Sequence, residues 1–217
     1  MLLEKLRQDV LDAARSLKIL ELAWMEGGAV SARDPETGYI IVTPSGMDYE
    51  KISAKDLIIV DLDMNIIEGK YRPSVATNLW NEIFRVRQDV HALVHSHSPY
   101  ATAFSVINQP IPIITETQAD WFGKPITVAP YAHIEDAHFL TAPVEYLGDG
   151  FGVLLGQHGP ITVGKTIHEA VERAVTLEEA SKTFYIAKVI GEPQIFSEHQ
   201  AFRSFEYYQN RYGQKIK

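Results

Sequence analysis

Cysteine is absent from this chain of 217 residues, and its absence excludes two classes of site. Without thiols the protein has neither a disulfide framework nor a thiolate metal centre, so a transition metal must be bound by histidine, carboxylate or water. The sequence also lacks a run of lysine or arginine and carries a formal net charge of −8. These features argue against nucleic acid or an anionic membrane as the main partner and favour a small molecule.

Long apolar runs are missing as well. The N-terminal segment MLLEKLRQDVLDAARSL places charges every few residues, unlike a signal peptide, and no stretch approaches the length that crosses a membrane. No composition break or linker divides the chain, and a hydrophobic content of 46% is enough for one substantial core. We therefore expect a soluble, cytoplasmic protein with a single domain over residues 1–217.

Apolar spacing predicts the main helices and strands. Helices are expected over residues 2–20, 77–87 and 99–107, and from a Thr166/Glu169 capping-box pattern through Ile190, with a further C-terminal helix through Tyr208. Strands are expected at 39–43, 57–62 and 90–97, and as a pair broken at Gly159-Pro160 within 152–163. Early strands followed by outer helices indicate a layered α/β fold.

Two histidines stand two residues apart in HALVHSHSP, at the end of an apolar segment. Side chains two apart on a strand share one face, so His95 and His97 are expected to point the same way. A second apolar strand, in LLGQHGPITVGK, is expected to end at His158, where Gly-Pro lets the backbone turn. Three imidazoles that converge would leave one position of a catalytic zinc open for water or substrate.

Four motifs occur in order along nearly the whole chain, namely TPSG at 43–46, RPS at 72–74, VHSHSPYATA at 94–103 and QHGPITVGK at 157–165. Together they resemble the class II aldolase/adducin family. The resemblance implies a three-layer α/β/α fold with a central, mainly antiparallel sheet flanked by helices. It also implies a homotetramer with active sites at subunit interfaces and a Zn²⁺ ion held by His95, His97 and His158.

The resemblance further implies a reaction. The expected activity is metal-dependent aldol cleavage of a sugar phosphate, a ketose phosphate like L-fuculose 1-phosphate, to dihydroxyacetone phosphate and an aldehyde through a zinc-stabilised enediolate. One alternative is a sugar-phosphate epimerase similar to L-ribulose-5-phosphate 4-epimerase, and another is a metal-binding protein of this fold that has lost catalysis. Other divalent transition metals also suit a three-histidine site.

The chain departs from the family pattern where an acidic residue is expected after RPS, because Ala76 stands there. The resemblance offers three replacements as catalytic residues. Glu116 falls where the aldolases have a tyrosine, Asp120 lies in a stretch that resembles the epimerase proton donor, and Tyr212 matches a tyrosine of the family's C-terminal tail. The competing interpretations are a solvated loop carboxylate for Glu116 and an ordinary docked tail for Tyr212.

A second departure concerns the phosphate. Ala29 replaces the asparagine that the family has in this loop, and Val75 replaces a serine. The resemblance still assigns substrate or phosphate binding to four residues, namely Gly28, Ser45, Gly46 and Ser74, through hydroxyl and backbone N–H groups. Simple turn geometry at positive φ is the alternative explanation for the two glycines.

Overall fold

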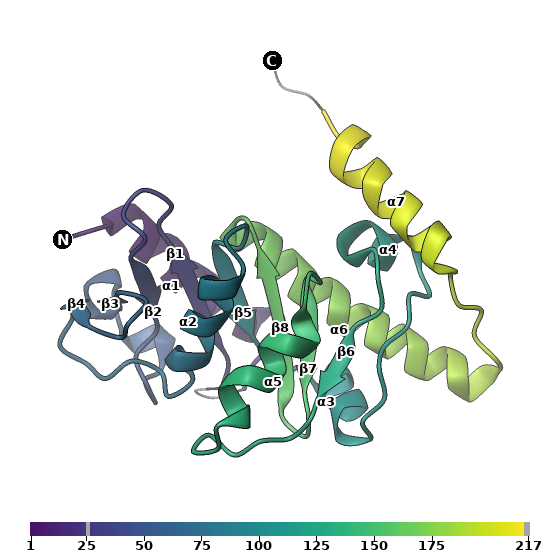
Figure 1. Ribbon diagram of the computed structural model, residues 1–217, viewed down its shortest axis with the longest axis horizontal. Helices are drawn as coiled ribbons and strands as arrows, with labels where there is room; N and C mark the ends of the chain where they lie inside the picture. The colour runs from purple at the N-terminus through teal and green to yellow at the C-terminus, as the bar shows by residue number, and fades with distance from the viewer. Residues whose placement is uncertain (25–26, 215–217) are drawn as a thin grey trace.

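A computed structural model describes residues 1–24 and 27–214. The described strands are β1 (Ala29–Arg33), β2 (Ile40–Val42), β3 (Ile58–Val60), β4 (Ile66–Glu68), β5 (Ala92–His95), β6 (Thr127–Ala129), β7 (Gly152–Leu155) and β8 (Gly159–Gly164). They form one sheet of eight strands in the order β4-β3-β2-β1-β5-β8-β7-β6 (Figure 1). Neighbouring strands in this part of the chain pair antiparallel, except β6 with β7.

Helices cover both faces of this sheet. The described helices are α1 (Glu4–Ile19), α2 (Thr77–Val86), α3 (Pro99–Val106), α4 (Glu116–Phe122), α5 (His138–Leu147), α6 (Ile167–Ile190) and α7 (Glu198–Arg211), with two 3₁₀ turns at Tyr49–Lys51 and Ala54–Asp56. Helices α2 and α5 pack on one face, and α1 and α6 on the other. The expected three-layer α/β/α fold with a mainly antiparallel sheet is therefore confirmed.

The third part of the core lies beside β6 and β7, where α3, α4 and α6 pack together with one residue of α7, Ala201. Helix α7 packs mainly on α4 and lies at the periphery of the molecule (Figure 1). It extends to Arg211, three residues beyond the predicted end. No helix within the described ranges is both long and apolar enough to span a membrane.

The local signals for α1 and α6 are largely confirmed. In α1 the buried face contains Val10, Ala14 and Leu17, as the helical spacing predicts. Thr166 caps α6 by accepting a hydrogen bond from the Glu169 N–H. The Glu169 carboxylate, however, accepts from the N–H of Lys165. Only half of the predicted capping box is therefore formed as expected.

Two predicted strand boundaries are wrong. Strand β5 ends at His95, so His97 lies beyond it, where its N–H donates to the Leu22 carbonyl at 2.9 Å. The turn between β7 and β8 occupies residues 156–158, and Gly159-Pro160 already belongs to β8. The turn falls earlier because Gln157 adopts the left-handed conformation (φ 56°), while the Pro160 carbonyl accepts a hydrogen bond from the Ser96 N–H.

Candidate metal centre

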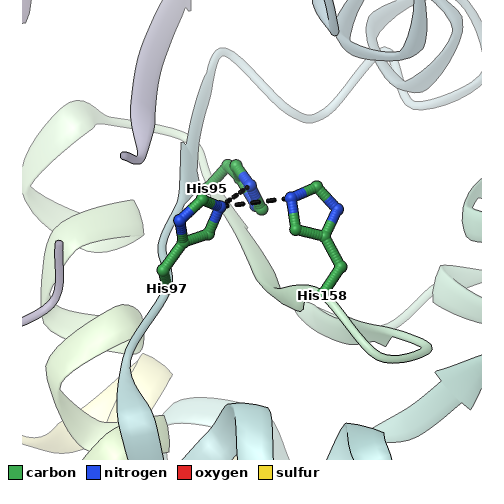
Figure 2. Close-up of side chains that lie close together, drawn as sticks. All are labelled: His95, His97 and His158. Carbon is green, nitrogen blue, oxygen red and sulfur yellow. Dashed lines mark hydrogen bonds between the residues drawn. The ribbon is translucent and has the colours of Figure 1, made fainter. Parts of the chain in front are cut away.

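Three imidazole rings converge beside the middle of the sheet (Figure 2). The Nε2 atom of His97 lies 3.0 Å from Nε2 of His95 and 3.1 Å from Nε2 of His158. The ring centroids are 4.7–5.0 Å apart. These residues form a group with metal-ligand spacing, and each can offer one nitrogen. The sequence predicted this convergence.

The sheet brings these histidines together from distant parts of the chain. His95 is the last residue of β5 and lies opposite Ala29 of β1 and Ile161 of β8 in the ladder. His158 is the last residue of the β7–β8 turn, immediately before β8. Because β5 and β8 are neighbours in the sheet, the end of β5 and the start of β8 lie side by side, and so do their histidines.

The protonation of His95 follows from its hydrogen bond. Its Nδ1 lies 3.0 Å from the Pro160 carbonyl oxygen, which can only accept, so Nδ1 carries the proton and Nε2 presents a lone pair. Burial, reinforced by the charges of His158 and His97, holds the pKa of His95 well below its usual value. Burial also lowers the pKa of His97 and His158. All three rings therefore favour the neutral form that binds metals.

The donor set fits a divalent transition metal better than it fits a hydrogen-bonded trio. His97 Nε2 is within 3.1 Å of two other nitrogens, yet a single shared proton can bridge only one of these pairs at a time. Tetrahedral zinc with bonds of about 2.0–2.1 Å would separate its ligand nitrogens by roughly 3.3 Å. The observed separations are close to that spacing, and three ligands leave one position open.

Close neighbours hold the imidazoles in place. A Cβ atom at Gly27 would lie only 2.7 Å from Nδ1 of His97, so the ring occupies space that any side chain at this position would fill. The Trp80 ring of α2 packs beside the His95 ring, with the two ring centroids 5.6 Å apart. The sequence did not predict these roles for Gly27, Trp80 and the Pro160 carbonyl, and its available signal was the Gly27-Gly28 pair.

The comparisons with known proteins agree with this geometry. Residues 8–185 match the model of the class II aldolase and adducin N-terminal domain. The chain belongs to the class II aldolase and adducin family. A solved L-fuculose 1-phosphate aldolase is similar to this class II aldolase-family chain with a TM-score of 0.91 and 25% identity, over 94% of this chain and 96% of that one.

Two further structures resemble this class II aldolase-family chain. L-fuculose 1-phosphate aldolase from Glaciozyma antarctica PI12 has a TM-score of 0.78 and 27% identity, with 95% of this chain and 85% of that chain covered. YgbL from Escherichia coli, a candidate aldolase, epimerase or decarboxylase, has a TM-score of 0.83 and 24% identity, over 93% and 98% of the two chains. The second of these supports the fold alone.

The three expected catalytic residues lie around α4 and α7. Glu116 is the exposed first residue of α4, which is capped by Thr115, so it belongs to a helix and not to a loop. The Asp120 carboxylate accepts a hydrogen bond from the Ser204 hydroxyl at 3.0 Å. Tyr212 follows α7, is 66% exposed and stacks on Tyr208. Asp120 and Tyr212 contact residues of α7, and in the described part of the chain no hydrogen bond joins any of the three to the three histidines.

Burial raises the pKa of Asp120 above its usual value, and the charge of Glu116 adds to this effect. The hydrogen bond from Ser204 acts in the opposite direction. The carboxyl group of Asp120 therefore retains a proton at higher pH than an ordinary aspartate does. A retained proton is the property that a general acid needs.

The expected phosphate-binding residues lie in two segments that pair with each other. The Ser45 N–H donates to the Arg72 carbonyl and the Ser74 N–H to the Thr43 carbonyl, both at 3.0 Å. This pairing brings together Ser45, Gly46 and Ser74, close in sequence to the N-terminus of α2 at Thr77. The Tyr49 hydroxyl links this region to the loop before β1 by donating to the Gly28 carbonyl at 2.9 Å.

The two glycines in this set differ in their surroundings. Gly28 has a φ of 83°, and a Cβ there would lie 3.1 Å from the His95 carbonyl oxygen, so turn geometry and close approach account for it. Gly46, at φ 63°, has open space around it. Both glycines have a positive φ, which fits the alternative explanation by turn geometry, and a positive φ is not in itself a sign of a ligand.

Of the two alanines that depart from the family pattern, Ala29 pairs with a residue of the imidazole cluster and Ala76 is linked to the cluster through Trp80. Ala29 is opposite His95 in the β1–β5 ladder. Ala76 is the N-cap residue of α2, and its carbonyl accepts from the N–H of Trp80, the residue that packs on His95. A carboxylate at position 76 would therefore stand about one helical turn from the tryptophan that contacts the cluster.

Proposed function

We propose that this protein is a zinc-dependent lyase that cleaves a ketose phosphate, similar to L-fuculose 1-phosphate, into dihydroxyacetone phosphate and an aldehyde. The observation that carries this proposal is the convergence of three neutral imidazoles on one point, with Nε2 separations of 3.0 and 3.1 Å. The likeness to an L-fuculose 1-phosphate aldolase over nearly the full length of both chains supports the choice of reaction.

His95, His97 and His158 would hold the metal through Nε2. The Pro160 carbonyl orients His95 by accepting its Nδ1–H, and a fixed orientation of this kind preserves ligand geometry. Once bound, a divalent cation supplies Lewis-acid stabilisation of the negative charge that develops on the substrate oxygens when a carbon–carbon bond breaks. The paired segments that contain Ser45, Gly46 and Ser74 would bind the phosphate group through hydroxyl and backbone N–H groups.

Proton transfer must come from groups other than residue 76, which is alanine. We assign it to Asp120 and Tyr212, with Glu116 as the third candidate, because burial raises the pKa of Asp120 and the exposed Tyr212 stacks on Tyr208, whose own pKa is raised first by burial and also by the charge of Asp120. All three stand on the peripheral α4–α7 unit (Figure 1). In a homotetramer, this unit would reach the metal centre of a neighbouring copy.

A sugar-phosphate 4-epimerase is the second candidate function. An epimerase of this type would use the same bond cleavage and then add the aldehyde back through its other face. The specific observation in its favour is Asp120, whose raised pKa suits a proton donor and whose surrounding sequence, ADWF, resembles the epimerase motif.

The first experiment combines elemental metal analysis with a retro-aldol assay on ketose 1-phosphates and an epimerase assay on L-ribulose 5-phosphate. Zinc at one equivalent with release of dihydroxyacetone phosphate supports the lyase, and epimerisation supports the second candidate. His97→Gln should lose metal and activity. His133→Gln, at an exposed histidine outside the cluster, should retain both. Failure of the wild-type protein to bind a divalent metal would refute both functions, whereas binding without turnover would leave a metal-binding protein that has lost catalysis.

A further inference from the structure

A buried carboxylate on α6 holds the start of α3. Glu178 is only 9% exposed. Its Oε1 accepts from the Tyr100 N–H at 2.9 Å, and its Oε2 accepts from the Ala101 N–H at 2.8 Å. These two N–H groups belong to the first turn of α3, where N–H groups have no hydrogen-bond partner within the helix. Glu178 therefore satisfies the first turn of α3 from a different helix.

The local sequence provides no such cap. Ser98 occupies the N-cap position of α3 but makes no side-chain capping hydrogen bond. Its hydroxyl lies 3.3 Å from the hydroxyl of Ser96 instead. A serine cap would usually satisfy one of these N–H groups within the same segment. Because it does not, the position of the first turn of α3 depends on α6.

The residue before Ser98 is His97, so the turn held by Glu178 directly continues the metal-binding segment. His95 is fixed by the ladders with β1 and β8. His97 lies beyond the strand and is held by its N–H bond to the Leu22 carbonyl and by the helix that follows. The carboxylate of Glu178 thus fixes one end of the short segment that carries His97.

We propose that Glu178 is a positioning residue of the metal centre, which holds the first turn of α3 and thereby keeps His97 where its imidazole can bind the metal together with His95 and His158. This inference rests on the proposed metal centre. Loss of the carboxylate would leave two N–H groups without a charged acceptor and would release the segment between β5 and α3. The effect on the metal is indirect, because Glu178 contacts the backbone of α3.

The test measures metal binding, without the enzymatic reaction. Wild-type protein and Glu178→Gln are stripped of metal and titrated with Zn²⁺ by calorimetry and with Co²⁺ by visible absorption. We expect the metal Kd of Glu178→Gln to rise roughly 10–100-fold, as for other residues that orient metal ligands, with a changed Co²⁺ spectrum. Glu178→Asp keeps the charge and should restore part of the affinity.

Two controls separate positioning from general effects. Glu179→Gln removes the exposed carboxylate next along α6 and should leave the metal Kd unchanged. Phe184→Leu disturbs the stacked Phe104–Phe184 pair between the same two helices. It serves as a control for any loss of stability that Glu178→Gln causes. Equal metal Kd values for Glu178→Gln and Phe184→Leu at similar melting temperatures would overturn the proposal. If the wild-type protein binds no metal, the proposed function fails as well.

Wild-type protein provides a test that needs no variant to fold. If the first turn of α3 and the metal centre are coupled, metal binding must stabilise that turn. Amide hydrogen exchange at Tyr100 and Ala101 should therefore slow when Zn²⁺ is added to the metal-free protein. Slower exchange in the β7–β8 turn with no change at these two amides would show that α3 is not coupled to the metal, and would also overturn the proposal.

Discussion

A methyl group added at Gly27 would lie 2.7 Å from Nδ1 of the His97 ring. Ordinary van der Waals contact begins near 3.4 Å, so Gly27→Ala must displace the imidazole by about 0.7 Å or rotate it away. Metal–nitrogen bonds tolerate deviations of only about 0.2 Å. The required movement exceeds that tolerance about threefold, and His97 would be lost or badly placed as a ligand.

We expect Gly27→Ala to raise the Kd for Zn²⁺ by roughly 10–100-fold, measured by competition with a chelating dye. A Cβ at Gly27 would also lie 2.9 Å from the Trp24 carbonyl oxygen, so the backbone must shift as well and the melting temperature of the metal-free protein should fall. The matched control is Gly191→Ala, since a Cβ there meets nothing within 4 Å. A Kd for Gly27→Ala within a factor of two of the Gly191→Ala value would refute His97 as a ligand in this geometry.

Three further predictions concern the metal, pH and residue 76. Removing the metal with a chelator should lower the free energy of unfolding, and restoring Zn²⁺ to 100 times its Kd should return about 2.7 kcal/mol, read from denaturant curves. The pKa of His95 is depressed in the folded state, so the unfolded chain binds more protons below about pH 6.5. The free energy of unfolding of the metal-free protein should therefore fall as pH drops below about 6.5. His95→Asn should flatten that pH dependence in the same denaturant curves. Ala76→Glu should raise the retro-aldol rate by roughly 10²–10⁴-fold if general acid-base help is what the wild-type site lacks, and an unchanged kcat would contradict that explanation.

The elements that the sequence predicted well are those whose apolar residues recur with one clear period. Helices α1 and α6 are of this kind. Strands β2 and β3 were also predicted, but as short runs of Ile and Val that are buried throughout. Strand β1 was missed because Ser31 and Arg33 interrupt its apolar residues, although both are buried. Arg33 can lie there because its guanidinium donates to the carbonyl oxygens of Phe84, Gln88 and Val90, partners that no local pattern reveals.

Helices α4 and α5 were missed for different reasons. Helix α4 has only seven residues, too few to show a helical period. Helix α5 contains Pro143, which ordinarily argues against a helix interior. Both missed helices are short or interrupted, so their identity depends on packing against α7 and against the sheet, respectively.

The three histidines were predictable as a group because each stands at or near the end of an apolar strand and the motifs around them resemble one family. What surrounds them was not. Trp80, the Pro160 carbonyl and Glu178 come from other elements, and their roles depend on how the sheet and helices pack. The family resemblance named His95, His97 and His158 as the expected ligands, whereas the groups that orient their rings depend on the fold.

The position of the cluster between β5 and the β7–β8 turn has a consequence for folding. Residues His97 and His158 are 61 positions apart, and they meet only after β5 has paired with β8. Pairing between such distant segments is slow compared with helix formation. The cluster therefore forms late in folding. If it binds metal as proposed, the appearance of the Co²⁺ absorption band during refolding would time the closure of the central sheet.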